Sequence, residues 1–218
     1  MNLLSKPLPV LLLCCLVMAV FWLAPQARSE VLINEILGDP SSDWDGDGAF
    51  NYRDDEWIEV INTGPAAENL EDYWLRDTTG DDLHLQLSGS LEAGQVAVFY
   101  GSEASAWQRE QGNTVVGLSI NNAGDTLELL QTVSGPGGAS LEVVHSVTVT
   151  DHEADDDRSG GTDPDTGEWV LYDALNPYNG AAVPQGNDCE PTPGMPNSCA
   201  PLVPTDTTTW DAVKSQYR

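Results

Sequence analysis

The sequence predicts an all-β fold, a sandwich or a barrel, on three observations. Apolar runs of strand length recur along the chain, and Gly, Pro, Asn or Asp residues stop each of them. Helical periodicity is nearly absent between these runs. Apolar residues make up 40% of the 218 residues, so the composition does not indicate disorder.

Seven segments have strand character, several with apolar and polar residues in alternation. The first is stopped by Gly38-Asp39-Pro40 and the second by Thr63-Gly64-Pro65. Helical character is limited to one possible turn over 103–108 and to the tail 207–218, where Trp210, Val213 and Tyr217 have helical spacing. The predicted strands are 31–37, 57–62, 73–76, 83–87, 95–100, 126–130 and 141–149.

The pattern changes after Thr150. Residues 151–165 are acidic and contain one apolar residue, Ala154, which predicts a solvated loop. The short apolar run 169–172 predicts an edge strand, and the Pro-rich and Gly-rich segment 176–204 predicts irregular structure.

The first 29 residues resemble a secretory signal peptide. Lys6 precedes an uncharged apolar run, and small residues follow at Ala27 and Ser29, which allows cleavage after either one. The run is also long enough to remain as a membrane anchor. We therefore expect a secreted or extracellular protein, with a periplasmic or anchored one as the alternative. The expected division is a signal over 1–29, a domain over 30–197 and a tail over 198–218.

Cysteine usage agrees with export. Cys14 and Cys15 lie in the predicted signal, which leaves Cys189 and Cys199 as an even pair. In an exported chain such a pair predicts a disulfide, here closing a short loop. No histidine lies near these cysteines, so neither a metal site nor a catalytic thiol has support.

The formal charge of −27 limits the partners. A chain this acidic is repelled by phosphate backbones, which argues against nucleic-acid binding. Anionic membrane surfaces are disfavoured for the same reason. The expected partners are a protein or a polysaccharide at the cell surface.

Several segments together resemble the lamin-tail domain family, in the form found in exported bacterial proteins. They occur in the family's order and cover about residues 31–197: Leu32-Ile33-Asn34-Glu35-Ile36, Glu56-Trp57-Ile58-Glu59-Val60-Ile61-Asn62, Tyr73-Trp74-Leu75-Arg76-Asp77 and Pro191-Thr192-Pro193-Gly194-Met195-Pro196-Asn197. The resemblance implies an immunoglobulin-like β-sandwich that acts as a binding or accessory module. In this chain an acidic loop follows the first strand, and we expect the disulfide to pin the irregular C-terminal segment.

That acidic loop, Asp43-Trp44-Asp45-Gly46-Asp47-Gly48, begins like a calcium-binding loop. Carboxylates at positions 1, 3 and 5 with glycine at position 6 match the start of an EF-hand loop, although no flanking helices are expected. The count predicts a structural Ca²⁺ held by Asp43, Asp45, Asp47, Ala49, Asn51 and Asp54, where Asp55 or Glu56 could replace Asp54. The alternative is a solvated acidic loop. A second acidic run, 151–157, lacks this spacing.

No catalytic motif is found, so we expect no enzymatic activity. Two alternatives remain, a carbohydrate-binding accessory domain and a hydrolase of the cell envelope. Trp44, Trp107 and Tyr178 lie in predicted loops and could form a sugar platform. The competing interpretation is that these rings cover the edges of the core.

Overall fold

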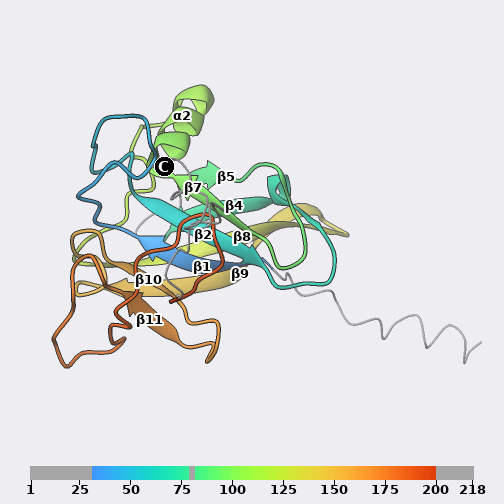
Figure 1. Ribbon diagram of the computed structural model, residues 1–218. Helices are drawn as coiled ribbons and strands as arrows, with labels where there is room; N and C mark the ends of the chain where they lie inside the picture. The colour runs from blue at the N-terminus through green and yellow to red at the C-terminus, as the bar shows by residue number, and fades with distance from the viewer. Residues whose placement is uncertain (1–30, 79–81, 200–218) are drawn as a thin grey trace, which may run out of the picture.

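Two antiparallel sheets pack face to face around one apolar core (Figure 1). The computed structural model describes residues 31–78 and 82–199. The five-stranded sheet has the order β11 (Trp169–Tyr172), β10 (Ser159–Thr162), β1 (Val31–Leu37), β2 (Trp57–Asn62) and β7 (Val96–Tyr100). The four-stranded sheet has the order β5 (Leu83–Gln86), β4 (Tyr73–Asp77), β8 (Gly124–Gly135) and β9 (Gly138–Thr150).

A small two-stranded sheet closes one end of the sandwich. It pairs β3 (Glu68–Asn69) with β6 (Ser90–Leu91), and the 3-10 helix η2 (Leu70–Asp72) follows β3 directly. The immunoglobulin-like sandwich implied by the family resemblance is confirmed.

Alternating side chains of both sheets form the core. Ile33, Ile58 and Val60 come from the five-stranded sheet, and Leu75 and Leu129 come from the four-stranded sheet. All five are at most 1% exposed. Burial of a side chain of this size contributes about 1.5–3 kcal/mol, so this shared layer supplies most of the force that holds the sheets together.

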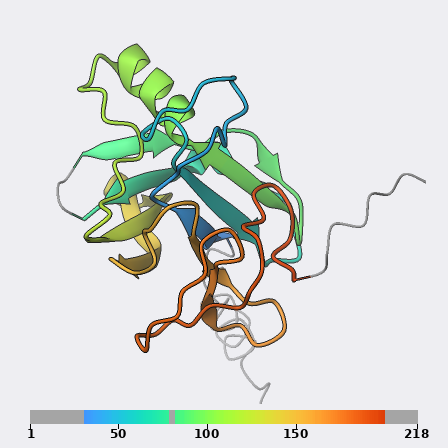
Figure 2. The same ribbon diagram turned by 60° about the vertical axis from the view of Figure 1, so that its left-hand side comes forward.

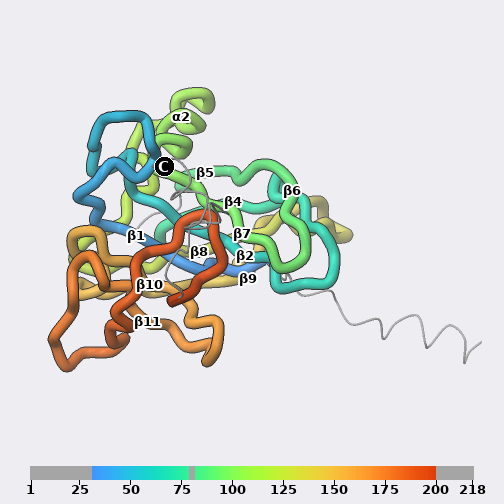
Figure 3. The backbone as a smooth tube through the Cα atoms, in the orientation of Figure 1, coloured from blue at the N-terminus to red at the C-terminus, as the bar shows by residue number. Residues whose placement is uncertain are grey.

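The outer face of the five-stranded sheet is also covered. Trp57, the first residue of β2, lies on that face and is fully buried. Its ring centroid is 6.1 Å from that of Trp44, in the loop that follows β1. The C-terminal segment 173–199, orange to red in Figure 3, crosses the same face. Hydrogen bonds from Thr192 and Gly194 to side chains of β1 and β2 hold it there.

Most strands lie where the sequence predicts them, but the prediction for residues 151–165 is wrong. Ser159–Thr162 forms β10, an inner strand between β11 and β1, and Asp157 and Arg158 before it are buried. Gly160 and Gly161 carry no side chain, so no apolar pattern marks this strand. A Cβ on Gly161 would lie 2.9 Å from Glu35 Cγ and from a Tyr172 ring carbon, which explains the glycine.

The single turn expected over 103–108 is an eleven-residue helix, α2 (Gly101–Gln111). The Glu103 carboxylate accepts a hydrogen bond from the Tyr100 N–H before the first turn, and Gly112 ends the helix with φ 72°. Its buried side consists of small or polar residues, including Ala104, Ser105 and Gln108. Hydrophobic periodicity therefore could not reveal the helix.

The C-terminal part agrees with the sequence. β11 is an edge strand, residues 173–199 are irregular, and Cys189 and Cys199 form a disulfide with their Cα atoms 5.1 Å apart. The predicted signal (1–29) and the predicted tail helix (207–218) lie outside the described residues. In the described part of the chain, no helix combines the length and apolar character needed to cross a membrane.

The start of α2 requires glycine because the loop after β1 returns against it (Figure 2). The Gly101 N–H donates to the Glu56 carbonyl, and a Cβ at position 101 would lie 1.7 Å from the Arg53 carbonyl oxygen. Gly101→Ala should therefore destabilise the protein by about 1–3 kcal/mol in urea unfolding, although alanine favours helices. Gly137→Ala is the control, because a Cβ there meets nothing within 4 Å. Equal stability of the two variants would contradict this account.

Candidate functional site

The acidic loop brings three carboxylates together. Ligand oxygens of Asp43, Asp45 and Asp55 lie within 4.8 Å of one another. Asp55 is fully buried and accepts hydrogen bonds from the backbone N–H groups of Trp44 (2.7 Å), Asp45 (3.1 Å) and Asn51 (2.7 Å). The buried Asp55 carboxylate thus fixes both ends of the loop, and it lies beside the exposed Asp43 and the half-buried Asp45.

The other predicted ligands lie outside this group of three. Asp47 accepts a hydrogen bond from the Ala49 N–H, and Asn51 donates its side-chain amide to Asp54. The other oxygen of Asp54 accepts from Ser105 Oγ on α2. The geometry therefore favours Asp55, rather than Asp54, as the third carboxylate beside Asp43 and Asp45.

The second acidic run holds the same loop from outside. Asp157 accepts hydrogen bonds from the Ser41 N–H and hydroxyl, from the Ser42 hydroxyl and from Trp44 Nε1, all between 2.6 and 2.7 Å. Burial opposes the charge on Asp157, but these hydrogen bonds hold its pKa below the ordinary value. Its neighbours Asp155 and Asp156 form a second carboxylate group with Asp39, which is mostly exposed.

Two buried glutamates lie side by side on the outer face of the five-stranded sheet. The register of β1 and β2 shifts at Asn34, a bulge, and places Glu35 opposite Glu59. Both are fully buried. Glu35 accepts from Ser159 Oγ (2.5 Å), Thr192 N–H (3.1 Å) and Thr192 Oγ1 (2.7 Å).

The second glutamate completes the contact with the C-terminal segment. Glu59 accepts from the Asn34 side-chain amide (2.7 Å) and from the Gly194 N–H (2.8 Å). Asn34 also donates to Asn197 Oδ1 (2.7 Å), and Asn197 donates to the Thr162 carbonyl. We call Asn34, Glu35, Glu59, Thr192, Gly194 and Asn197 the glutamate clamp. It joins β1 and β2 to residues 192–197 and makes the segment part of the domain.

Burial changes the titration of these glutamates. It raises the pKa of Glu35 to about 7, against the hydrogen bonds from Ser159 and Thr192, which lower it. Burial, together with the nearby charge of Glu35, raises the pKa of Glu59 to about 7. Glu56, which accepts from the Ile120 N–H, has its pKa raised by burial to about 8. The native protein therefore retains protons that the unfolded chain releases near pH 4.5.

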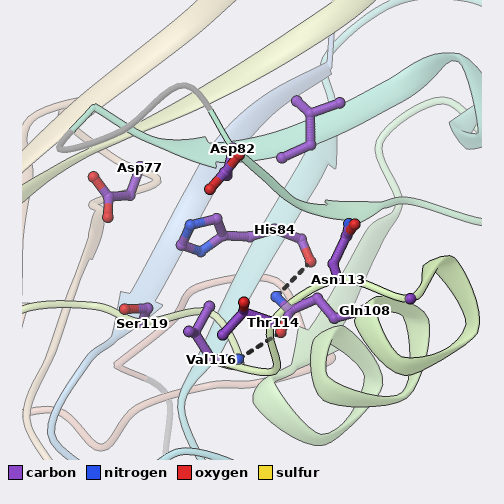
Figure 4. Close-up of a pocket in the computed structure, with 10 residues that line it drawn as sticks. Asp77, Asp82, His84, Gln108, Asn113, Thr114, Val116 and Ser119 are labelled. Atoms are coloured by element: carbon purple, nitrogen blue, oxygen red, sulfur yellow. Dashed lines mark hydrogen bonds between the residues drawn. The ribbon is translucent and has the colours of Figure 1, made fainter.

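A polar cavity of about 560 Å³ lies between β5, the end of α2 and the loop 112–119 (Figure 4). Gln108 fixes its walls. The side-chain NH₂ donates to the carbonyls of His84 (2.9 Å) and Gly117 (2.8 Å), and the side-chain oxygen accepts from the N–H groups of Val116 (2.7 Å) and Gly117 (3.1 Å). The lining residues with polar side chains are Asp77, Asp82, His84, Gln108, Asn113, Thr114 and Ser119.

The three loop aromatics pack against other groups. Trp44 lies against Trp57, and Trp107 meets Trp74 edge to face with 6.1 Å between ring centroids. The ring centroids of Tyr178 and His152 are 4.8 Å apart, and the Arg158 guanidinium carbon lies 5.3 Å from the Tyr178 ring centroid. All three are half-buried, as the interpretation that they cover the core edges expects.

Comparison with known families identifies the chain. The family model described as "Lamin Tail Domain" matches residues 24–151, more than half of the chain. Comparison with curated proteins finds no match. The chain belongs to the lamin tail domain family, a family of non-catalytic immunoglobulin-like interaction domains. The match ends before β10 and β11, which complete the five-stranded sheet.

The acidic loop is visible in the sequence, but the glutamate clamp and the cavity are not. The segments that carry the family resemblance contain all the clamp residues, yet their spacing, 34–35, 59 and 192–197, gives no sign that they meet. The cavity depends on His84, which its strand alternation marks only as a face residue. It also depends on Gln108, which the sequence places at the end of a single helical turn.

The raised pKa values predict a stability that falls as pH rises. Because native Glu35 and Glu59 hold protons up to about pH 7 and the unfolded chain only to about 4.5, the native state binds more protons in between. The free energy of unfolding should therefore decrease from about pH 5 to 8 in urea unfolding series. Glu35→Gln should reduce this decrease, whereas the exposed Glu92→Gln should not. Parallel curves for the two variants would refute the assignment.

Proposed function

We propose that this chain is an exported interaction module of the lamin tail domain family, similar to those of exported bacterial proteins, which binds a partner protein at the cell surface. The observation that carries the proposal is the Cys189–Cys199 disulfide in a non-catalytic immunoglobulin-like domain. Disulfides persist in oxidising compartments and are rare in the cytosol. The signal-like pattern of residues 1–29 supports the same location.

The proposal includes a structural Ca²⁺ in the acidic loop. Asp43, Asp45 and Asp55 would hold it, and Asp47 and backbone carbonyls of the loop would complete the oxygen ligands that calcium requires. Support comes from the 1, 3, 5 spacing of Asp43, Asp45 and Asp47 in the sequence. The approach of Asp43, Asp45 and Asp55 within 4.8 Å of one another supports it independently. A bound cation would offset the repulsion between these charges. Extracellular calcium modules bind with dissociation constants of about 10⁻⁴–10⁻³ M, which suits the proposed location.

Calcium should stabilise the protein through this loop. After chelation, addition of about 5 mM CaCl₂ should raise Tm by several degrees in calorimetry, since a ligand that binds only the native state stabilises it by mass action. Asp45→Asn should abolish the increase. Asp165→Asn, an exposed acid in the turn between β10 and β11, is the matched control and should retain it. An unchanged Tm with calcium, or the same increase in both variants, excludes the site.

Export is tested separately by the N-terminus of the protein recovered from the culture medium. Cleavage after Ser29 gives a chain that starts at Glu30, and cleavage after Ala27 gives one that starts at Arg28. Mass spectrometry distinguishes these products from the uncleaved chain. Recovery of the whole chain in the cytosol, with both C-terminal cysteines reduced, would overturn the proposed location.

A further inference from the structure

The polar cavity between β5 and α2 contains a buried side chain with an unused acceptor. His84 is 9% exposed, and its Nδ1 lies 2.6 Å from the Leu118 carbonyl oxygen. A carbonyl only accepts hydrogen bonds, so Nδ1 carries the proton and Nε2 of the neutral ring is an acceptor. Among the described residues, Nε2 has no hydrogen-bond partner. In Figure 4 the ring points toward the part of the cavity where Asp77, Asp82 and Ser119 lie.

The cavity is rich in acceptors and anionic. Asp77 and Asp82 contribute carboxylates, His84 contributes Nε2, and the hydroxyls of Thr114 and Ser119 accept as well as donate. No lysine or arginine lines it within the described residues. The amide group of Gln108 cannot serve a ligand, because all four of its hydrogen-bonding positions bind the cavity wall. A complementary ligand must therefore bring several donors and positive charge.

The geometry disfavours a single metal ion. Asp77, Asp82 and His84 do not form a group whose ligand atoms all lie within 4.8 Å of one another, unlike the carboxylates of the acidic loop. A guanidinium group fits better, because it spreads five N–H donors over a planar fork and pairs with separated acceptors. A volume of about 560 Å³ also falls in the usual range of organic ligand sites, about 300–1,000 Å³.

The surface beyond the cavity can receive a chain attached to that group. A second hollow of about 440 Å³ shares Asp77 and Ser119 with the first. Arg53, Asn121, Asn122 and Asp125 also line this second hollow. The side-chain oxygens of Asn121 and Asp125 accept N–H groups of their own loop, so the hollow offers a path for an attached chain through its shape. Ser119, at the junction, has φ 60°, a conformation that costs free energy in a residue other than glycine.

We propose that this cavity is the partner-recognition site of the module and binds an arginine side chain of a polypeptide partner. The assignment rests on the proposed interaction role and gives it a chemistry. Asp82 pairs with the guanidinium charge, and His84 Nε2 accepts one of its N–H groups. The rigid wall built by Gln108 keeps these acceptors in position before the partner arrives, which reduces the entropy lost on binding.

Titration of the ¹⁵N-labelled protein with the blocked tripeptide acetyl-Gly-Arg-Gly-amide in 150 mM NaCl tests the assignment. We expect saturable shifts at the amides of Leu83, His84 and Thr114, with a dissociation constant on the order of 1 mM. The citrulline analogue, which has the same shape without the charge, should bind at least about tenfold more weakly. Addition of CaCl₂ alone should leave these amides unshifted.

Two variants separate the cavity from general attraction to an acidic protein. Asp82→Asn removes an exposed carboxylate that makes no contact needed for folding among the described residues, and it should weaken binding by about fivefold or more. Asp165→Asn removes the same charge outside the cavity and should change binding by less than about twofold. Equal effects of the two, equal binding of citrulline, or shifts elsewhere would overturn the assignment. The test uses purified protein, so its failure leaves the export and calcium results unaffected, and their failure leaves this one unaffected.

Discussion

The glutamate clamp is the interaction on which the arrangement of the molecule depends. Asn34, Glu35 and Glu59 put polar groups on a sheet face from which water is excluded, and such groups are costly unless hydrogen-bonded. Ser159 and Thr192 donate hydrogen bonds to Glu35, and Gly194 donates one to Glu59. Asn197 accepts one from the Asn34 side-chain amide. These hydrogen bonds hold a segment without secondary structure against strands that precede it by about 130 to 160 residues in the sequence. Because of the clamp, the five-stranded sheet is covered on both faces, by the four-stranded sheet on one and by the C-terminal segment on the other.

Carboxylates that accept several hydrogen bonds from an irregular segment also hold the acidic loop. Asp55 and Asp157 each accept several hydrogen bonds from a loop that has little apolar surface of its own. A formal charge of −27 is therefore not only a surface property. Part of it sits on buried or half-buried carboxylates that organise loops over the sheet, and the remainder is exposed and available to cations. This division explains how so acidic a chain keeps both a packed sandwich and two hollows lined by acids.

The residue pattern predicts the strands of the sandwich better than the segments that connect them. Strands with apolar alternation, such as 57–62, were predicted to the residue because one face must be buried. β10 has no sequence signal, because Gly160 and Gly161 carry no side chain. Only one turn of α2 is predicted, because the helix buries small or polar residues such as Ser105 and Gln108. The acidic loop was visible as a local spacing, although Asp55 in place of Asp54 depends on how the loop folds. Contacts between distant residues, such as Glu35 with Thr192 and His84 with Leu118, leave no local signal.

The most direct measurement of the clamp is native-state hydrogen exchange at the amides of Thr192 and Gly194. Both N–H groups donate to buried carboxylates, so they should exchange as slowly as amides in the centre of β1 and β2, although they lie in an irregular segment. The exposed residues 179–181 of the same segment, whose amides donate to no group among the described residues, provide the reference for an unprotected loop. Exchange of Thr192 and Gly194 at that fast rate would show that the C-terminal segment opens independently of the sheet and would contradict the account.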